Sequence, residues 1–114
     1  MADSPTSRTL AALRAAGWTA DVVQRWIPGA RIRKDYLGLF DIICFDDTFT
    51  MGIQCTTSAH HAAHAKKMHA NPMLAKWHCG RTRGAELWSW HKVAGKWQQR
   101  VEAIEPLDDG VSLS

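Results

Sequence analysis

The stretch that decides the fold is Leu37-Gly-Leu-Phe-Asp-Ile-Ile-Cys-Phe45, which leads through Asp46-Asp-Thr48 into Phe49-Thr-Met-Gly-Ile-Gln-Cys-Thr56. The first segment is a short, nearly continuous apolar run, which is the pattern of a strand buried on both faces. The two aspartates and the threonine that follow predict a turn, after which the second segment returns as another strand. We therefore expect a hairpin over residues 37–56 at the centre of a sheet.

Two polar side chains interrupt this hairpin, one on each arm. With a two-residue turn at its tip, the hairpin places Asp41 directly opposite Gln54, about 5 Å away and on the same face as Thr56. A carboxylate in apolar surroundings costs free energy unless it is compensated, so Asp41 is either a ligand-binding group or the partner of a buried arginine such as Arg33. The opposite face is expected to carry the apolar side chains of the hairpin, namely Phe40, Ile42, Cys44, Met51, Ile53 and Cys55.

The segments on either side of the hairpin predict the remaining elements. The first helix is expected to start at a Thr6 or Ser7 cap and to stop at Gly17. The order α-β-β-β-α-β-β indicates an α/β (α+β) domain with one mostly antiparallel or mixed sheet flanked by helices. The expected elements are a helix at 7–16, a strand at 19–27, the hairpin, a helix from Ser58, a short helix opened by Pro72, and strands at 87–93 and 97–104.

Length and composition predict one soluble domain. The 114 residues, of which 46% are apolar and 22% charged, suit a single packed domain at 1–105, followed by a flexible C-terminal tail at 106–114. The longest apolar run is far shorter than a membrane span requires, and the first residues lack the pattern of a secretory signal, so no membrane association is expected. Three cysteines form no close pair, which favours free thiols in a reducing compartment and predicts a cytoplasmic location.

The charge distribution is compatible with a polyanionic partner. The net charge is +3, but all 14 Lys and Arg residues lie between Arg8 and Arg100 together with only six acidic residues. The middle of the chain is therefore more basic than the total indicates. The six tryptophans are expected to form much of the core, and the alternative is that one or two are exposed to stack on nucleic-acid bases.

A family resemblance is carried by the same residues. The segment Arg33-Lys-Asp-Tyr-Leu-Gly-Leu-Phe-Asp41-Ile-Ile, followed by Met51-Gly-Ile-Gln-Cys-Thr56 and a lysine-bearing helix, resembles the core of the PD-(D/E)XK nuclease superfamily. Small phage and bacterial Holliday-junction-resolvase-like and VRR-NUC-like proteins are the members it suggests. The resemblance covers about residues 10–100 and implies a restriction-endonuclease-like core. It further implies that Asp41 holds a metal ion, that Gln54 takes the second acidic position and that the Cys55 carbonyl completes the inner ligands.

The chemistry of phosphodiester hydrolysis explains why such a site needs these metal ligands. Hard oxygen ligands hold Mg²⁺ or Mn²⁺, which polarises the phosphoryl oxygen and lowers the pKa of an attacking water. One certain carboxylate predicts weak metal binding. Thr56 stands where the family places a lysine, and a hydroxyl cannot replace an ammonium group electrostatically. Helical spacing places Ala59, Ala63, Lys66 and Ala70 on the stripe expected to meet the sheet, so Lys66 is preferred over Lys67 as the substitute.

The leading hypothesis is a metal-dependent DNA endonuclease or resolvase-like protein. Its catalytic residues are Asp41, Gln54 and Lys66, its substrate is DNA, branched DNA included, and the resemblance implies a homodimer. Residues expected to contact phosphates are Arg31, Arg33, Lys34, His60, His64 and Lys67.

Three alternatives remain open. The chain could be a catalytically inactive nuclease-fold module that binds nucleic acid or a partner protein, or an interaction protein without affinity for nucleic acid. The spacing of His60 and His64 could also hold Zn²⁺, although no further ligand pair in the sequence completes four ligands.

Overall fold

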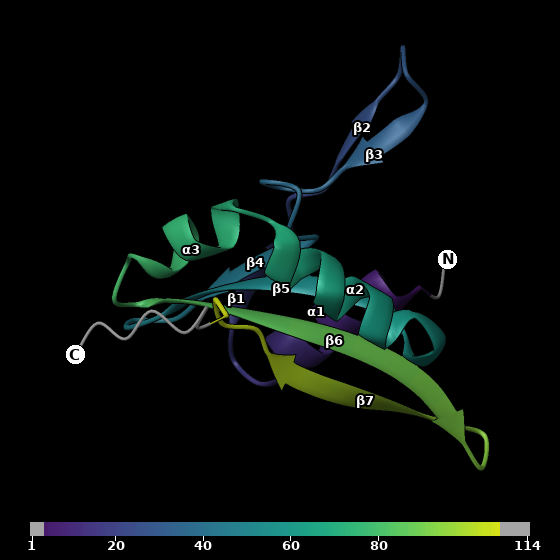
Figure 1. The fold of residues 1–114 in the computed structure, drawn as a ribbon. Coiled ribbons are helices and arrows are strands. Elements are labelled where there is room, and N and C mark those ends of the chain that lie inside the picture. Colours follow the sequence, from purple (N-terminus) through teal and green to yellow (C-terminus); the bar gives the residue numbers. More distant parts are fainter. Residues whose placement is uncertain (1–3, 108–114) are drawn as a thin grey trace.

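The computed structural model describes residues 4–107 and contains a five-stranded mixed sheet with the strand order β1-β4-β5-β6-β7 (Figure 1). Neighbouring strands are antiparallel except β5 and β6, which are parallel because two helices connect them. The strands are β1 (Thr19–Val22), β4 (Ile42–Phe45), β5 (Thr50–Thr57), β6 (Arg83–Val93) and β7 (Lys96–Ala103).

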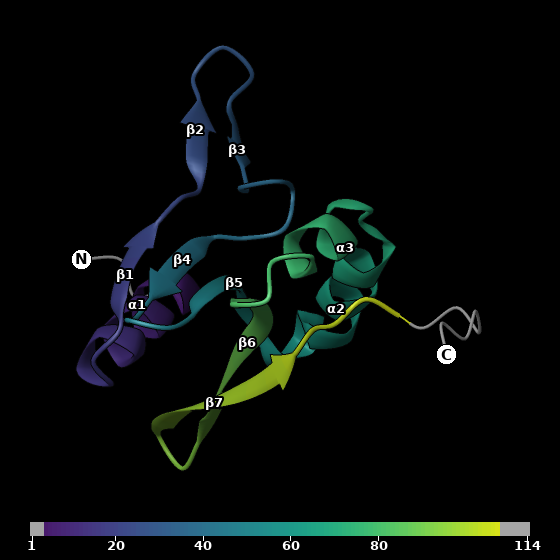
Figure 2. The same cartoon turned by 90° about the vertical axis from the view of Figure 1, so that its left-hand side faces the viewer.

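Helices cover both faces of this sheet. Figure 2 shows α1 on one side, and α2 and α3 on the other. The helical elements are α1 (Pro5–Ala15), the 3-10 turn η1 (Ser58–His60), α2 (His61–Ala70) and α3 (Met73–His78). The predicted architecture of a mixed sheet flanked by helices is therefore confirmed, with the element order expected for the main sheet. No helix within residues 4–107 is long and apolar enough to cross a membrane.

The first helix starts earlier than the sequence predicted. Its cap is Ser4, whose side chain accepts a hydrogen bond from the Ser7 backbone while the Ser7 side chain accepts one from the Ser4 backbone. Pro5 occupies the first turn, where its missing N–H costs nothing. The prediction that Thr6 or Ser7 caps the helix is therefore wrong, because the serine pair closes a capping box one turn earlier.

The strand predicted at 19–27 is split between two sheets. The main-sheet strand β1 ends at Val22, and the chain then leaves the body of the protein to form a separate two-stranded hairpin from β2 (Arg25–Ile27) and β3 (Ile32–Lys34). This hairpin extends away from the rest of the molecule in Figures 1 and 2. Its second strand was not predicted, because three of the five residues at 30–34 are charged and the alternation of Ala30 and Ile32 with arginine is too short to indicate a strand.

The strand predicted at 37–45 begins only at Ile42. Leu37 and Gly38 adopt positive φ angles of 59° and 70°, and a bridge between Tyr36 and Phe40 closes a tight turn. This turn redirects Phe40 to the α2–α3 side of the sheet. The prediction that Phe40 shares a face with Ile42 and Cys44 is therefore wrong.

Two apolar clusters, one on each side of the sheet, form the core. The cluster beneath α1 contains Leu13, Ala20, Ile42, Cys44, Ile53 and Cys55. The cluster beneath α2 and α3 contains Leu39, Phe40, Met68, Leu74, Ala85, Leu87 and Ile104. A Cβ atom at Gly52 would lie 2.5 Å from the Phe40 ring, so only glycine leaves room for that ring on the sheet.

The C-terminal strands form a tight hairpin. Ala94 and Gly95 at its tip both have positive φ angles, as a two-residue turn with the twist of the strands requires. The described chain then runs past Ile104 to Leu107 without regular structure. The flexible tail was predicted at 106–114, and its residues 108–114 lie outside the described residues.

Candidate functional site

A cavity of about 390 Å³ opens where β4 begins and β5 ends. Four parts of the chain meet there: the start of α1, the base of the β2–β3 hairpin, the end of β5 and the entry to α2. The residues that line it are Ser4, Pro5, Thr6, Gln24, Arg33, Asp35, Asp41, Gln54, Cys55, Thr56, Thr57, His60 and His64.

The hairpin register brings the two predicted polar residues together. Ile42 pairs with Ile53, and the Asp41 N–H donates to the Ile53 carbonyl at 2.8 Å, so the next pair along the ladder is Asp41 and Gln54. Both side chains line the cavity, although each is largely buried. The predicted register of the β4–β5 hairpin is confirmed.

A second carboxylate, which the sequence did not single out, lies beside Asp41. Asp35 and Asp41 each accept a hydrogen bond of 2.9 Å from the Gln24 side-chain amide. Asp35 also accepts one of 3.0 Å from the Gln54 amide, which in addition donates to the Leu39 carbonyl at 2.7 Å. Two glutamine side chains thus hold two carboxyl groups against each other.

The proximity of the two acids changes their protonation. Burial raises the pKa of Asp41 to about 7, and Asp35 adds to the rise, whereas the Cys55 amide and Arg33 oppose it. Burial also raises the pKa of Asp35, but hydrogen bonds from Gln54 and Gln24 outweigh it, so this pKa lies below its usual value. Below about pH 7 the pair therefore holds one proton, which Asp41 carries.

The raised pKa of Asp41 predicts that the free energy of unfolding depends on pH and that Asp41→Asn reduces this dependence. Between the usual pKa of 3.8 and the folded value of about 7, the folded state holds a proton that the unfolded state releases. The stabilisation is therefore complete below pH 3.8 and is lost as the pH rises through about 7, with a total of the order of a few kcal/mol. Asparagine resembles the protonated acid at every pH, so Asp41→Asn should lose less free energy of unfolding than the wild type between about pH 4 and about pH 8. Urea unfolding of both proteins at the two pH values measures the difference. An identical change in the two proteins would contradict the shared proton.

Oxygen atoms are the ligands that this site offers to a cation. Asp41 accepts a hydrogen bond from the Cys55 N–H at 2.9 Å. Because the N–H and C=O of a strand residue point to the same edge, the Cys55 carbonyl is directed to that side as well. Residues 4–107 bring no three His, Cys, Asp or Glu side chains together as a metal-binding group, so the histidine-based zinc site is not assembled. A cation between Asp35 and Asp41 would take its further ligands from amide, carbonyl and water oxygens, as Mg²⁺ does.

The cationic side chains divide into two groups. Arg33, His60 and His64 line the cavity, and Lys67 acts electrostatically on Asp35, lowering its pKa. Arg31 and Lys34 are exposed on the projecting hairpin and are not among the lining residues.

The face of α2 that packs on the sheet is not the predicted one. It carries His61, Ala65 and Met68, whereas Lys66 is exposed and does not line the cavity. The prediction that Lys66 lies on the stripe that meets the sheet is therefore wrong, because His61, which is buried and hydrogen-bonded to Ser89, faces the sheet instead.

Sequence reasoning missed Gln24 and Asp35 although a signal for them exists. Arg25 pairs with Lys34 in the β2–β3 hairpin, and the next pair along that register is Gln24 with Asp35. Recognising Pro28-Gly29 as the tip of a hairpin would have placed both residues at its base.

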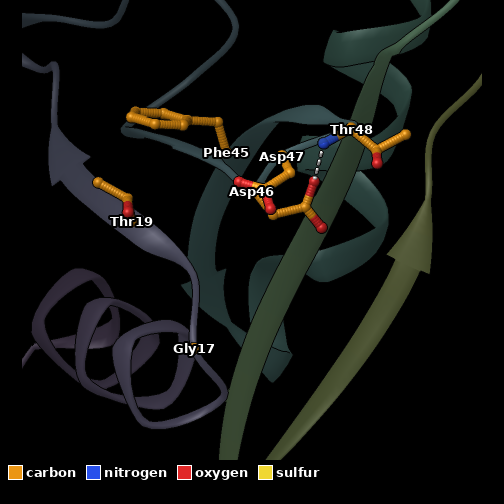
Figure 3. Close-up of a pocket in the computed structure, with 6 residues that line it drawn as sticks. All are labelled: Gly17, Thr19, Phe45, Asp46, Asp47 and Thr48. Atoms are coloured by element: carbon orange, nitrogen blue, oxygen red, sulfur yellow. Dashed lines mark hydrogen bonds between the residues drawn. The ribbon is translucent and has the colours of Figure 1, made fainter.

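A second cavity, of about 450 Å³, lies beside the β4–β5 turn (Figure 3). Its acidic residues are Asp46 and Asp47. The Asp46 carboxylate accepts hydrogen bonds from the backbone of Thr48 at 2.8 Å and of Phe49 at 2.7 Å, which lower its pKa. This carboxylate therefore organises its own turn, and no cationic or nucleophilic side chain accompanies it among the residues that line the cavity.

A serine, a histidine and a glutamate also form a hydrogen-bonded chain under α2. His61 lies 2.7 Å from the Ser89 hydroxyl through Nδ1 and 2.7 Å from the Glu102 carboxylate through Nε2. The residue types match a hydrolytic triad, but the two ring nitrogens have exchanged partners relative to it. Ser89 is also 0% exposed, so no substrate can reach its oxygen. These hydrogen bonds instead connect the first residue of α2 to β6 and β7.

Replacing His61 by alanine is expected to lower the free energy of unfolding by about 2–4 kcal/mol, because the Ser89 hydroxyl loses its buried partner and a cavity remains. Urea denaturation measures the loss, and His60→Ala, at an exposed position next to it, should change stability by less than about 0.5 kcal/mol. Equal effects of the two substitutions would show that the buried chain contributes nothing.

Comparison with protein-family models, with curated proteins and with solved structures gives no match to this chain.

Proposed function

We propose that the protein is a metal-dependent endonuclease that hydrolyses phosphodiester bonds of DNA in the cavity around Asp41. The observation that carries the proposal is the convergence of the Asp35 and Asp41 carboxylates with the Gln54 amide in a cavity that the Arg33 guanidinium also lines. The sheet order, with one helix before β1 and two between β5 and β6, also agrees with the restriction-endonuclease-like core that the sequence resemblance implies.

The donor set suits a divalent cation bound by oxygen. Asp35 and Asp41 would hold the ion, and the Cys55 carbonyl would supply a third oxygen. Two carboxyl groups in one buried site repel each other when both are ionised, and a divalent cation removes the cost that raises the pKa of Asp41. Gln54 would contribute its amide oxygen or orient a water. Mg²⁺ or Mn²⁺ bound there would polarise the scissile phosphate and lower the pKa of the attacking water.

The chain's own residues position the phosphate and balance its charge. In the reaction a water oxygen bonds to phosphorus, the bond to one ester oxygen breaks, and the released oxygen takes up a proton. Arg33, at the edge of the cavity, and Lys67, which already acts on Asp35, replace Lys66 as the cations we assign to the charge that develops on the phosphate. His60 and His64 complete the polar wall. The His60 ring can donate a hydrogen bond to a phosphate oxygen, whereas His64 donates through Nδ1 to the His60 carbonyl at 3.0 Å.

The test is cleavage of labelled branched and linear DNA in Mg²⁺, in Mn²⁺ and in EDTA. We expect products only with a metal ion. The double variant Asp35→Asn/Asp41→Asn, purified in parallel, excludes a contaminating nuclease, because it should give no products under any of these conditions. Cleavage that persists in EDTA, or in the double variant, would overturn the proposal.

One observation favours a second function, a nuclease-fold module that binds DNA without cutting it. Thr56 lines the cavity where the family places a lysine, so no ammonium group follows Gln54 on β5. Binding of DNA by the wild type with no product in either metal would establish this alternative. A homodimer is part of the nuclease proposal, because one site cuts one strand and the resemblance implies paired sites. The free thiols of the three cysteines support a cytoplasmic location.

A further inference from the structure

The β2–β3 hairpin presents a basic and partly apolar surface far from the core. The stretch 24–34 contains four cationic residues and no acidic residue. Trp26 and Ile32 are nevertheless 53% and 52% exposed, although side chains of this size are usually packed. Such a combination of positive charge and exposed apolar surface suits a polyanion that also carries apolar faces.

The register of the hairpin sorts these residues onto two faces. Trp26 pairs with Arg33, so their side chains stand next to each other on one face. The opposite face carries the pairs Arg25–Lys34 and Ile27–Ile32.

The Trp26 face is the one that continues into the candidate active site. Arg33 lines the cavity around Asp41 and donates a long hydrogen bond of 3.5 Å to Gln24, which holds both carboxylates. A DNA strand with one phosphate in the cavity would therefore pass Arg33 and reach the Trp26 indole with a neighbouring nucleotide.

We propose that Trp26 is a stacking platform for an unpaired base of the DNA strand that enters this cavity. The indole offers a flat apolar face with a guanidinium beside it, and every base has a face that can stack on such a ring. Bases inside a duplex are already stacked on both sides, so the hairpin selects DNA with single-stranded or branched segments. This inference rests on the proposed function, because it names the substrate class of the same cavity.

Trp97, the other exposed tryptophan, is a poorer platform for a base. Trp97 on β7 already has the Arg8 guanidinium 3.5 Å from its ring centroid, so that face of the indole is covered. The same ring has Lys92 at 5.2 Å. Trp26 is the better platform because its cationic neighbour Arg33 also belongs to the active-site cavity.

The test is the affinity of the full-length protein for a labelled single-stranded oligonucleotide in EDTA, followed by fluorescence anisotropy. Trp26→Ala should weaken binding by about 5- to 100-fold, the range for losing one stacked base. Trp26→Phe should stay within about threefold of the wild type, because a smaller ring still stacks. Ile32→Ala is the matched control, an equally exposed apolar residue on the opposite face, and should change affinity less than about twofold.

A second measurement isolates the indole itself. The difference in fluorescence between the wild type and Trp26→Phe reports one of the six tryptophans, and this signal should be quenched when the oligonucleotide binds. The inference would be overturned if the wild type and Trp26→Ala had equal affinities, or if the tryptophan signal were not quenched. It would also be overturned if Trp26→Ala lost as much affinity for a blunt duplex as for the single strand.

The two proposals fail differently. Loss of binding in Trp26→Ala without any metal-dependent cleavage by the wild type would remove the nuclease and keep the stacking platform. Metal-dependent cleavage by the wild type together with unchanged binding by Trp26→Ala would keep the nuclease and remove the stacking platform.

Discussion

Asp41→Asn is expected to reduce metal-dependent DNA cleavage at least about 1000-fold, since losing one of two carboxylate ligands removes several kcal/mol of transition-state stabilisation. The variant should fold normally. Asparagine keeps an oxygen that can accept from the Cys55 N–H, and its amide can donate to Asp35, although the hydrogen bond that Asp41 accepts from Gln24 is lost. Initial rates at saturating Mg²⁺ measure the effect.

The control for Asp41→Asn is Asp47→Asn, which makes the same charge change in the exposed β4–β5 turn and should cleave like the wild type. Asp35→Asn should also lose activity, because its carboxylate faces the same cavity. Cleavage by Asp41→Asn within about tenfold of the Asp47→Asn rate would contradict a role for Asp41 as a metal ligand.

Phe40→Ala is expected to lower the free energy of unfolding by about 3–5 kcal/mol, the usual cost of removing a buried phenylalanine. The ring is fully buried between the sheet at Gly52 and α3, where its centroid lies 4.9 Å from that of Trp77. Neighbouring side chains cannot close the space, because Gly52 provides no side chain to fill it. Chemical denaturation monitored by circular dichroism gives the value.

Phe49→Ala provides the comparison for this core substitution. Phe49 lies in the β4–β5 turn with its side chain 47% exposed, so its removal should cost less than about 1 kcal/mol. A loss at Phe40 no larger than the loss at Phe49 would contradict the packing of the tight turn at 36–40 onto the sheet.

The central hairpin could be predicted from the sequence because its signal is local. The first arm is a nearly continuous apolar run, and apolar residues alternate with polar ones or glycine in the second. The short turn fixes which residues face each other, so the neighbourhood of Asp41 and Gln54 followed from counting. The start of strand β4 at Ile42 could not be predicted in this way. Leu39 and Phe40 continue the apolar run, but left-handed backbone at Leu37 and Gly38 folds them against a different layer.

Pro28-Gly29 could have placed Gln24 and Asp35 at the base of one hairpin, but the contact of that hairpin with Asp41 joins separate segments and is encoded by no local pattern. Asp35 and Gln24 are brought to Asp41 by an inserted hairpin, whose strands consist of three residues each, half of them Arg or Lys. The rotation of α2 was equally inaccessible, because it is set by the buried contact of His61 with Ser89 on β6. An alanine-rich helix with scattered histidines and lysines has no apolar stripe strong enough to show which side packs.

The most direct test of the central claim is a crystal structure of the protein soaked in Mn²⁺ above pH 7, where Asp41 ionises more readily. We predict an anomalous difference peak between the Asp35 and Asp41 carboxylates, about 2.0–2.3 Å from an oxygen of each. Two carboxyl groups still sharing a proton, with Gln24 and Gln54 bonded to them and no peak in the cavity, would contradict a metal-dependent active site.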